Sequence, residues 1–105
     1  MSTEAGVSAA RFDLDRAWCV DDRVAVRPEP FGALLYHFGT RRLSFLKNTT
    51  VLAVVRSLAD HPSARSACAA AGVGPAVLPA YERALATLAE SRMIRERPAS
   101  ESTAS

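Results

Sequence analysis

The chain has 105 residues, of which 49% are hydrophobic and 23% are charged, and its formal net charge is only +2. A chain of this length forms one domain, and burial of roughly 60–70% of the unfolded surface lets it fold without crosslinks. The weak net charge excludes a protein-wide field that would by itself select a polyanion or an anionic membrane, so any attraction must come from local clusters.

Both ends of the chain are rich in small and polar residues. Residues 1–11 and 98–105 predict disordered tails around a single domain at residues 12–97. No segment has the pattern of a secretory signal, and no apolar run approaches the roughly 18 residues that a membrane span needs. We therefore expect a cytoplasmic protein without membrane contact.

The first half of the domain carries strand signals. Val24 and Val26 alternate with smaller or charged residues until Pro28 and Pro30 end the run, and the apolar segment GALLYHF follows from Gly32. Two strands of this kind, separated by a short proline-containing loop, predict the beginning of an antiparallel meander.

A hairpin completes the predicted meander. Gly39-Thr40 predicts its turn, and the run RRLSFLK, residues 41–47, then alternates as a strand does. We expect a three-stranded antiparallel sheet in which this last strand lies at an edge. One face of the strand carries Leu43 and Phe45, and the other carries Arg42, Ser44 and Leu46.

After Lys47 the apolar residues recur at helical spacing, and we expect three short helices. Asn48 is a good N-cap for the first helix and Ser63 for the second, which Gly72 then ends. We expect the regular part of the third helix to begin only at Pro79, because a proline further inside would break its hydrogen bonds. Its apolar face comprises Leu78, Tyr81, Leu85, Leu88 and Ala89.

Three strands followed by three helices, joined by short connections, indicate an α+β domain that is winged helix-turn-helix-like. That shape raises the alternative of a DNA-binding regulator, whose recognition helix would present basic and polar side chains to the duplex. The second expected helix offers Arg65 and little else, and the third places Glu82 beside Arg83. This charge balance does not suit a polyanion, so we expect no nucleic-acid partner and keep the regulator as a second hypothesis.

The sequence contains no catalytic or cofactor motif, such as a phosphate-binding loop, a nucleophile elbow or a zinc-binding helix. His37 is the best acid–base candidate, but a histidine between aromatic neighbours on a strand is typical of a buried, hydrogen-bonded position. Cys19 and Cys68 lack metal-ligand spacing, and Cys68 lies in an alanine-rich run that favours a buried free thiol. We expect no enzyme activity, no cofactor and no metal.

The strand at residues 41–47 combines apolar side chains with basic residues at both ends. An edge strand has unpaired N–H and C=O groups, which form a template for an extended peptide. Arg41, Arg42 and Lys47 would then attract an acidic peptide. The same charges could instead serve only to protect the edge from aggregation, and physical reasoning alone leaves these two interpretations about equal.

The run RVAVRPEPFGALLYHFGTRRLSFLKN, residues 23–48, resembles the precursor-peptide-binding chaperones of mycofactocin biosynthesis. DHPSARSACAAAGV and LPAYERALATLAESRMI are also similar to that family, so the resemblance covers residues 12–97. It implies a RiPP recognition element similar to the peptide chaperone of pyrroloquinoline quinone biosynthesis. Such a protein catalyses nothing itself. It binds the leader region of the precursor and presents it to a radical SAM maturase, which holds the iron–sulfur cluster and S-adenosylmethionine.

In that family's fold, the leader adds as a further strand beside the third strand, in a groove walled by the third helix. The helix face that lines the groove stays open, because its leucines suit the core equally well. An edge strand without its ligand could also pair with its own copy, which leaves a homodimer open. The resemblance implies peptide-binding roles for Arg41, Arg42, Leu43, Ser44, Phe45, Leu46 and Lys47 on the strand, and for Tyr81, Arg83, Leu85 and Leu88 on the helix.

Overall fold

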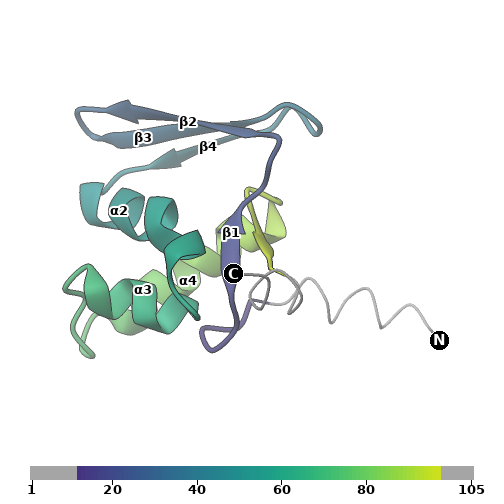
Figure 1. Ribbon diagram of the computed structural model, residues 1–105. Helices are drawn as coiled ribbons and strands as arrows, with labels where there is room; N and C mark the ends of the chain where they lie inside the picture. Colours follow the sequence, from purple (N-terminus) through teal and green to yellow (C-terminus); the bar gives the residue numbers. More distant parts are fainter. Residues whose placement is uncertain (1–11, 98–105) are drawn as a thin grey trace.

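A computed structural model describes residues 12–97, which form two small antiparallel sheets and a group of helices (Figure 1). The tails predicted at residues 1–11 and 98–105 lie outside the described residues. In chain order the elements are β1 (Trp18–Val20), β2 (Val24–Glu29), β3 (Gly32–His37), β4 (Leu43–Leu46), α2 (Thr49–Ser57), the 3₁₀ helix η1 (Leu58–Asp60), α3 (Ala64–Ala70), α4 (Leu78–Glu90) and β5 (Ile94–Glu96).

The main sheet confirms the predicted meander. Its strand order is β2-β3-β4, and both pairs are antiparallel, with Leu35 opposite Val26 on one side and Ser44 on the other. β4 therefore lies at an edge, as predicted. The helices α2, α3 and α4 follow the sheet in sequence, which confirms the α+β class.

Neither strand of the second sheet is predicted by the sequence pattern. β1 and β5 pair antiparallel with Trp18 opposite Glu96, and so bring the beginning and the end of the domain together. Strands of three residues are too short for a recognisable alternation, so only the pairing with a distant segment defines them. Trp18 is buried, and its indole N–H donates a hydrogen bond to the Asp13 carbonyl at 2.9 Å, which anchors this sheet in the core.

One face of the main sheet packs on α2. Ala33 and Leu35 of β3 and Leu46 of β4 point inward and are buried, and they share the hydrophobic core with Val54 and Val55 of α2. Figure 1 shows the sheet as a separate layer above α2, with α3 and α4 farther away. No described element covers the opposite face of the sheet in this view.

The helix boundaries follow local capping interactions. The Asn48 side chain accepts hydrogen bonds from two backbone N–H groups in the first turn of α2, at 2.6 and 3.2 Å, as predicted. Ser63 begins α3 in a reciprocal capping box with Ser66. α4 begins at Leu78, one residue earlier than expected, because Pro79 then stands in the first turn, where the helix needs no backbone donor.

Gly32 lies where β3 and the end of β4 come closest. Its φ is +148°, a conformation that residues with a side chain rarely adopt. A Cβ at this position would lie 1.9 Å from the Leu46 carbonyl oxygen and 2.9 Å from the Asn48 backbone nitrogen. Glycine is therefore needed for the chain to pass this point on its way from β4 into α2.

We expect Gly32→Ala to lower the free energy of unfolding by about 2–4 kcal/mol, because it combines backbone strain with a clash against backbone atoms. Urea denaturation followed by circular dichroism measures the loss. Gly74→Ala is the matched control, since a Cβ at Gly74 meets no atom within 4 Å. It should change the free energy of unfolding by less than about 0.5 kcal/mol. Equal effects of the two substitutions would contradict the close approach at Gly32.

Candidate functional site

The open edge of β4 is the first feature of the candidate site. Among residues 12–97, β4 pairs only with β3, and no described strand lies on its other side. The His37 N–H donates to the Arg42 carbonyl at 2.9 Å, and main-chain groups alternate in direction along an antiparallel strand. The N–H and C=O groups of Leu43 and Phe45 therefore point toward the open edge, whereas those of Ser44 point toward β3.

β4 begins later than predicted. It starts at Leu43, and both Arg41 and Arg42 lie in the connection from β3 instead of in the strand. The predicted turn at Gly39-Thr40 is too short, because the Arg41 N–H donates to the His37 carbonyl at 2.7 Å and so closes a longer loop. Arg41 has a φ of 64°, which is uncommon for a residue other than glycine.

His37 holds this connection in place. This residue is 2% exposed, and its Nδ1 accepts hydrogen bonds from the backbone N–H groups of Gly39 at 2.9 Å and Thr40 at 3.1 Å. Its Nε2 lies 3.8 Å from a carboxylate oxygen of Asp21. A buried ring with Nδ1 occupied in this way stabilises the loop, as expected from the sequence, and it is not placed to accept a proton from a substrate.

Two depressions flank the connection between β3 and β4, and charged residues make up half or more of the lining of each. The larger, about 580 Å³, lies against β1 and β5 and is lined by three carboxylates and three arginines, which leave little net attraction for a charged substrate. The smaller, about 450 Å³, brings Arg42 next to the C-terminal end of α4. It is lined by Thr40, Arg42, Glu90, Ser91 and Arg92.

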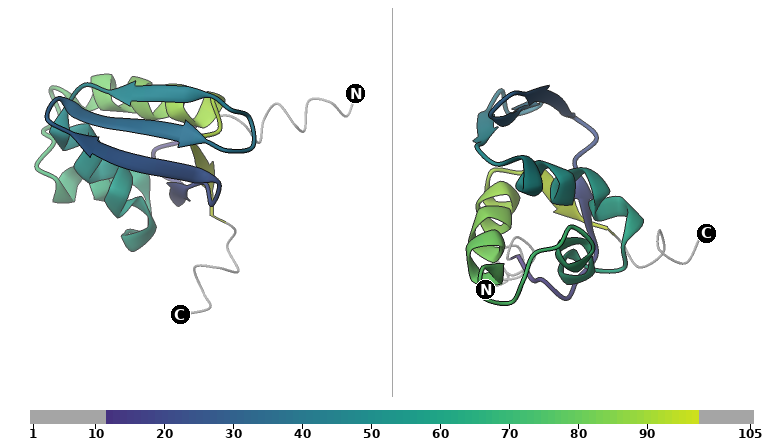
Figure 2. Two further views of the ribbon diagram at one scale, coloured as in Figure 1. Left: turned by 90° about the horizontal axis from the view of Figure 1, so that it is seen from above. Right: turned by 90° about the vertical axis from the view of Figure 1, so that its left-hand side faces the viewer.

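α4 lies along the side of the main sheet that ends in β4, as both views of Figure 2 show. The resemblance places the second wall of a peptide groove here, but two of its expected residues are not accessible. Leu85 is 0% exposed and Leu88 is 3% exposed, so neither can contact a peptide on the surface. The physical reason is that α4 has one apolar stripe, and packing in the domain core uses it.

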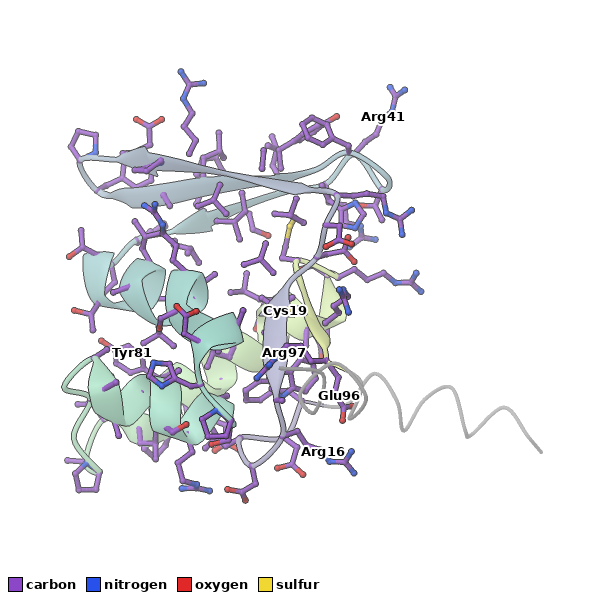
Figure 3. All side chains as sticks on the ribbon, viewed as in Figure 1. Arg16, Cys19, Arg41, Tyr81, Glu96 and Arg97 are labelled. Atoms are coloured by element: carbon purple, nitrogen blue, oxygen red, sulfur yellow. The ribbon has the colours of Figure 1, made fainter. Side chains whose placement is uncertain are left out.

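The other expected residues of α4 remain at the surface. Tyr81 is half-buried against the core and lies toward the end of the molecule opposite Arg41 (Figure 3). Arg83 is exposed. Glu90 and Arg92 beside the smaller depression were missed from the sequence, because only the folded connection brings Arg42 to them.

The expected residues of β4 divide between the two faces of the sheet. Leu46 is buried against the core, and Ser44 is half-buried on the same inward face. Leu43 is 55% exposed and Phe45 is 59% exposed on the outer face, and Lys47 is exposed just after the strand. β4 thus presents main-chain groups to the open edge and large apolar side chains to the outer surface.

In the part of the chain that the structure describes, reactive and metal-binding groups give no second site. Cys68 is a buried free thiol, as predicted, and burial raises the pKa of this thiol. Within residues 12–97, no group of three or more His, Cys, Asp or Glu side chains is placed to hold a metal ion. None of the helices in this part of the chain is long and apolar enough to cross a membrane.

We expect His37→Ala to lower the free energy of unfolding by about 2–3 kcal/mol, because it removes the acceptor of two backbone N–H groups and leaves a cavity. Thermal unfolding followed by circular dichroism measures the change. His61→Ala is the control, because His61 interacts through its backbone carbonyl, which the substitution retains. It should cost less than about 1 kcal/mol. A His37→Ala chain as stable as the original would show that the ring does not order the connection.

Comparison with known proteins gives consistent matches over most of the chain. The family model described as the peptide chaperone MftB family matches residues 17–95. A peptide chaperone MftB from Mycobacterium ulcerans is 64% identical over 91 residues, which cover 87% of this chain and 84% of that protein. The protein of the same name from Mycobacterium tuberculosis is 60% identical over 82% of this chain and 79% of its own length. The one from Mycolicibacterium smegmatis is 58% identical, with 90% and 91% covered. No solved structure matches the chain.

Proposed function

This chain belongs to the peptide chaperone MftB family, and we propose that it holds the leader region of its precursor peptide as an added strand on β4. As a member of that family it is a non-catalytic peptide chaperone that binds the mycofactocin precursor peptide for maturation. The proposal adds where the peptide lies and which partner receives it. That partner is a radical SAM maturase, which supplies the iron–sulfur cluster and S-adenosylmethionine.

The observation that carries this proposal is the open edge of β4. The main-chain groups of Leu43 and Phe45 point outward with no described strand beside them, and a peptide in extended form could pair with them. Each hydrogen bond contributes about 0.5–1.5 kcal/mol net, so a few of them orient a peptide without dictating its sequence. α4 lies on the side of the sheet that ends in β4, and the smaller depression brings Arg42 next to the end of that helix.

The charges near β4 suit an acidic leader peptide. Arg42 lines the smaller depression, Arg41 is exposed in the connection, and Lys47 is exposed after the strand. In a chain whose net charge is only +2, these residues form a local positive cluster along the edge. Such a cluster speeds the encounter with an oppositely charged peptide and favours one orientation of the bound peptide along β4. In this proposal, Tyr81 and Arg83 of α4 contribute the contacts farther from Arg42, since Tyr81 is half-buried and Arg83 is exposed.

We also propose that residues 12–97 act as one RiPP recognition element with a winged helix-turn-helix-like fold. The order of strands and helices supports this assignment. The alternative of a DNA-binding regulator has less support, because Arg65 of α3 is paired with Asp15, with 2.8 Å between Nε and the carboxylate oxygen. That hydrogen bond lowers the pKa of the Asp15 carboxyl. At neutral pH Asp15 is therefore ionised, and its negative charge offsets the positive charge of Arg65.

We expect Phe45→Pro to weaken the binding of a synthetic leader peptide by about tenfold or more, because proline removes the N–H that an added strand needs. Isothermal titration calorimetry measures the affinity. The sheet itself should persist, since this N–H points away from β3 and edge strands tolerate proline at such positions.

Phe45→Ala is the matched control for this experiment. It removes the same side chain but retains the N–H, so it should change the affinity by less than about threefold. An equal loss in the two variants would show that the Phe45 side chain binds the peptide, and it would contradict strand addition.

We expect Arg42→Glu to weaken the binding of an acidic leader peptide about fivefold at low salt, because it places a carboxylate beside the open edge. Arg56→Glu produces the same change in net charge at an exposed position on α2 and serves as the control. Raising the salt concentration should reduce the difference between the two variants. Equal weakening by both would mean that only the net charge of the chain matters.

A further inference from the structure

The outer face of the main sheet is apolar where a solvated face is usually polar. Leu34 and Tyr36 of β3 point outward beside Phe45 and Leu43 of β4, in opposed pairs. An antiparallel sheet with one face on the core commonly carries polar side chains on the other. Seen from above in Figure 2, this face has no described element over it. Apolar side chains in this position need an explanation beyond the stability of the domain.

Two aromatic pairs extend this surface to both ends of the sheet. The ring centroids of Phe31 and Phe45 are 6.4 Å apart, and Phe38 meets Tyr36 edge to face at 5.0 Å. Phe31 is still 48% exposed and Phe38 is 61% exposed, so the pairs hold these rings at the surface without burying them. Contiguous apolar patches on a monomer mark interaction sites. We define the outer-face patch as Phe31, Leu34, Tyr36, Phe38, Leu43 and Phe45.

The charges around the outer-face patch are mainly positive. Arg27 of β2 is the cross-strand partner of Leu34, and Lys47 lies two residues after Phe45. Arg41 extends from the hairpin connection, away from the helices (Figure 3). Glu29 lies beside Arg27, with 3.3 Å between the carboxylate oxygen and the guanidinium nitrogen. The surface therefore combines an apolar centre with a basic rim.

This charge pattern decides between two kinds of partner. A second copy of the chain docked on the same face would bring like charges together, which costs binding free energy. A different protein with an apolar contact surface and carboxylates around it would satisfy both parts of the patch. The aromatic and apolar groups at the centre of the patch would supply most of the affinity, and its charged rim would set the orientation of the partner.

We propose that the outer-face patch docks the maturase through an apolar surface bordered by carboxylates, while the open edge of β4 holds the leader peptide. This inference rests on the proposed function, because it requires an enzyme that receives the bound peptide. Leu43 and Phe45 join the two surfaces, since their main-chain groups face the edge and their side chains face outward. An enzyme docked on the patch would lie beside the bound peptide, at a high effective concentration of its substrate.

The double substitution Phe31→Ser with Phe38→Ser tests the patch at both ends and replaces no residue of β4. We expect it to weaken binding of the purified maturase by about tenfold or more, because it removes two exposed aromatic rings from the contact surface. The affinity of this variant for a synthetic leader peptide should stay within about twofold, because strand addition uses the main-chain groups of Leu43 and Phe45, which the substitutions retain. Biolayer interferometry with the full chain measures the first affinity, and calorimetry measures the second.

Val77→Ser is the matched control for exposed apolar surface. Val77 is 49% exposed just before α4, outside the main sheet, so maturase binding should not change. Arg27→Glu tests the rim separately and does not depend on how the serine variant folds. We expect it to weaken maturase binding about fivefold at low salt and to leave leader binding unchanged.

Unchanged maturase affinity in both patch variants would overturn the inference. A dimer that the double substitution abolishes in analytical ultracentrifugation would also overturn it, because a second copy would then occupy the patch. Patch-dependent binding of a single-stranded oligonucleotide would do the same, since aromatic residues on a sheet can stack with bases. If the chain binds leader peptide but not the maturase, this inference fails alone. If it binds the maturase through the patch but not the leader, the proposed function at β4 fails instead.

Discussion

The close approach at Gly32 is the constraint on which the arrangement of the site depends. Since a Cβ there would lie 1.9 Å from the Leu46 carbonyl oxygen, only glycine lets β3 begin where β4 ends. This meeting point sets the register in which Leu46 faces the core and Phe45 faces outward. Asn48, two residues after the strand, then caps α2, and the helix covers the inner face of the sheet.

β4 can serve several purposes because, within residues 12–97, it has a neighbouring strand on one side only. Half of its main-chain groups bind β3, and the other half remain at the open edge. Its inward side chains stabilise the core, whereas Leu43 and Phe45 form part of the outer surface. A strand in the centre of a sheet could not separate these roles, because both of its sides would be hydrogen-bonded. At Phe45, a substitution that removes the backbone N–H therefore tests binding at the open edge, whereas one that removes only the side chain tests binding at the outer face.

The features that could be predicted from the sequence are those determined by nearby residues. The alternation along β2 and β4 predicted the meander, and Asn48 and Ser63 cap their own helices. The length of the hairpin connection could not be predicted, because it depends on the buried ring of His37. The burial of Leu85 and Leu88 could not be predicted either, because their spacing suits the wall of a groove and a hydrophobic core equally well. The sheet of β1 and β5 requires contacts between opposite ends of the domain.

That second sheet determines how the domain can be linked to other proteins. Trp18 pairs with Glu96, and the Arg97 N–H donates to the Ala17 carbonyl at 2.8 Å, so the chain enters and leaves the domain at neighbouring points. The first and last strands of the domain thus pair with each other. Because these two points are neighbours, such a domain can be inserted into a surface loop of a larger protein. In an insertion of this kind, the neighbouring ends would serve as the hinge about which the module turns.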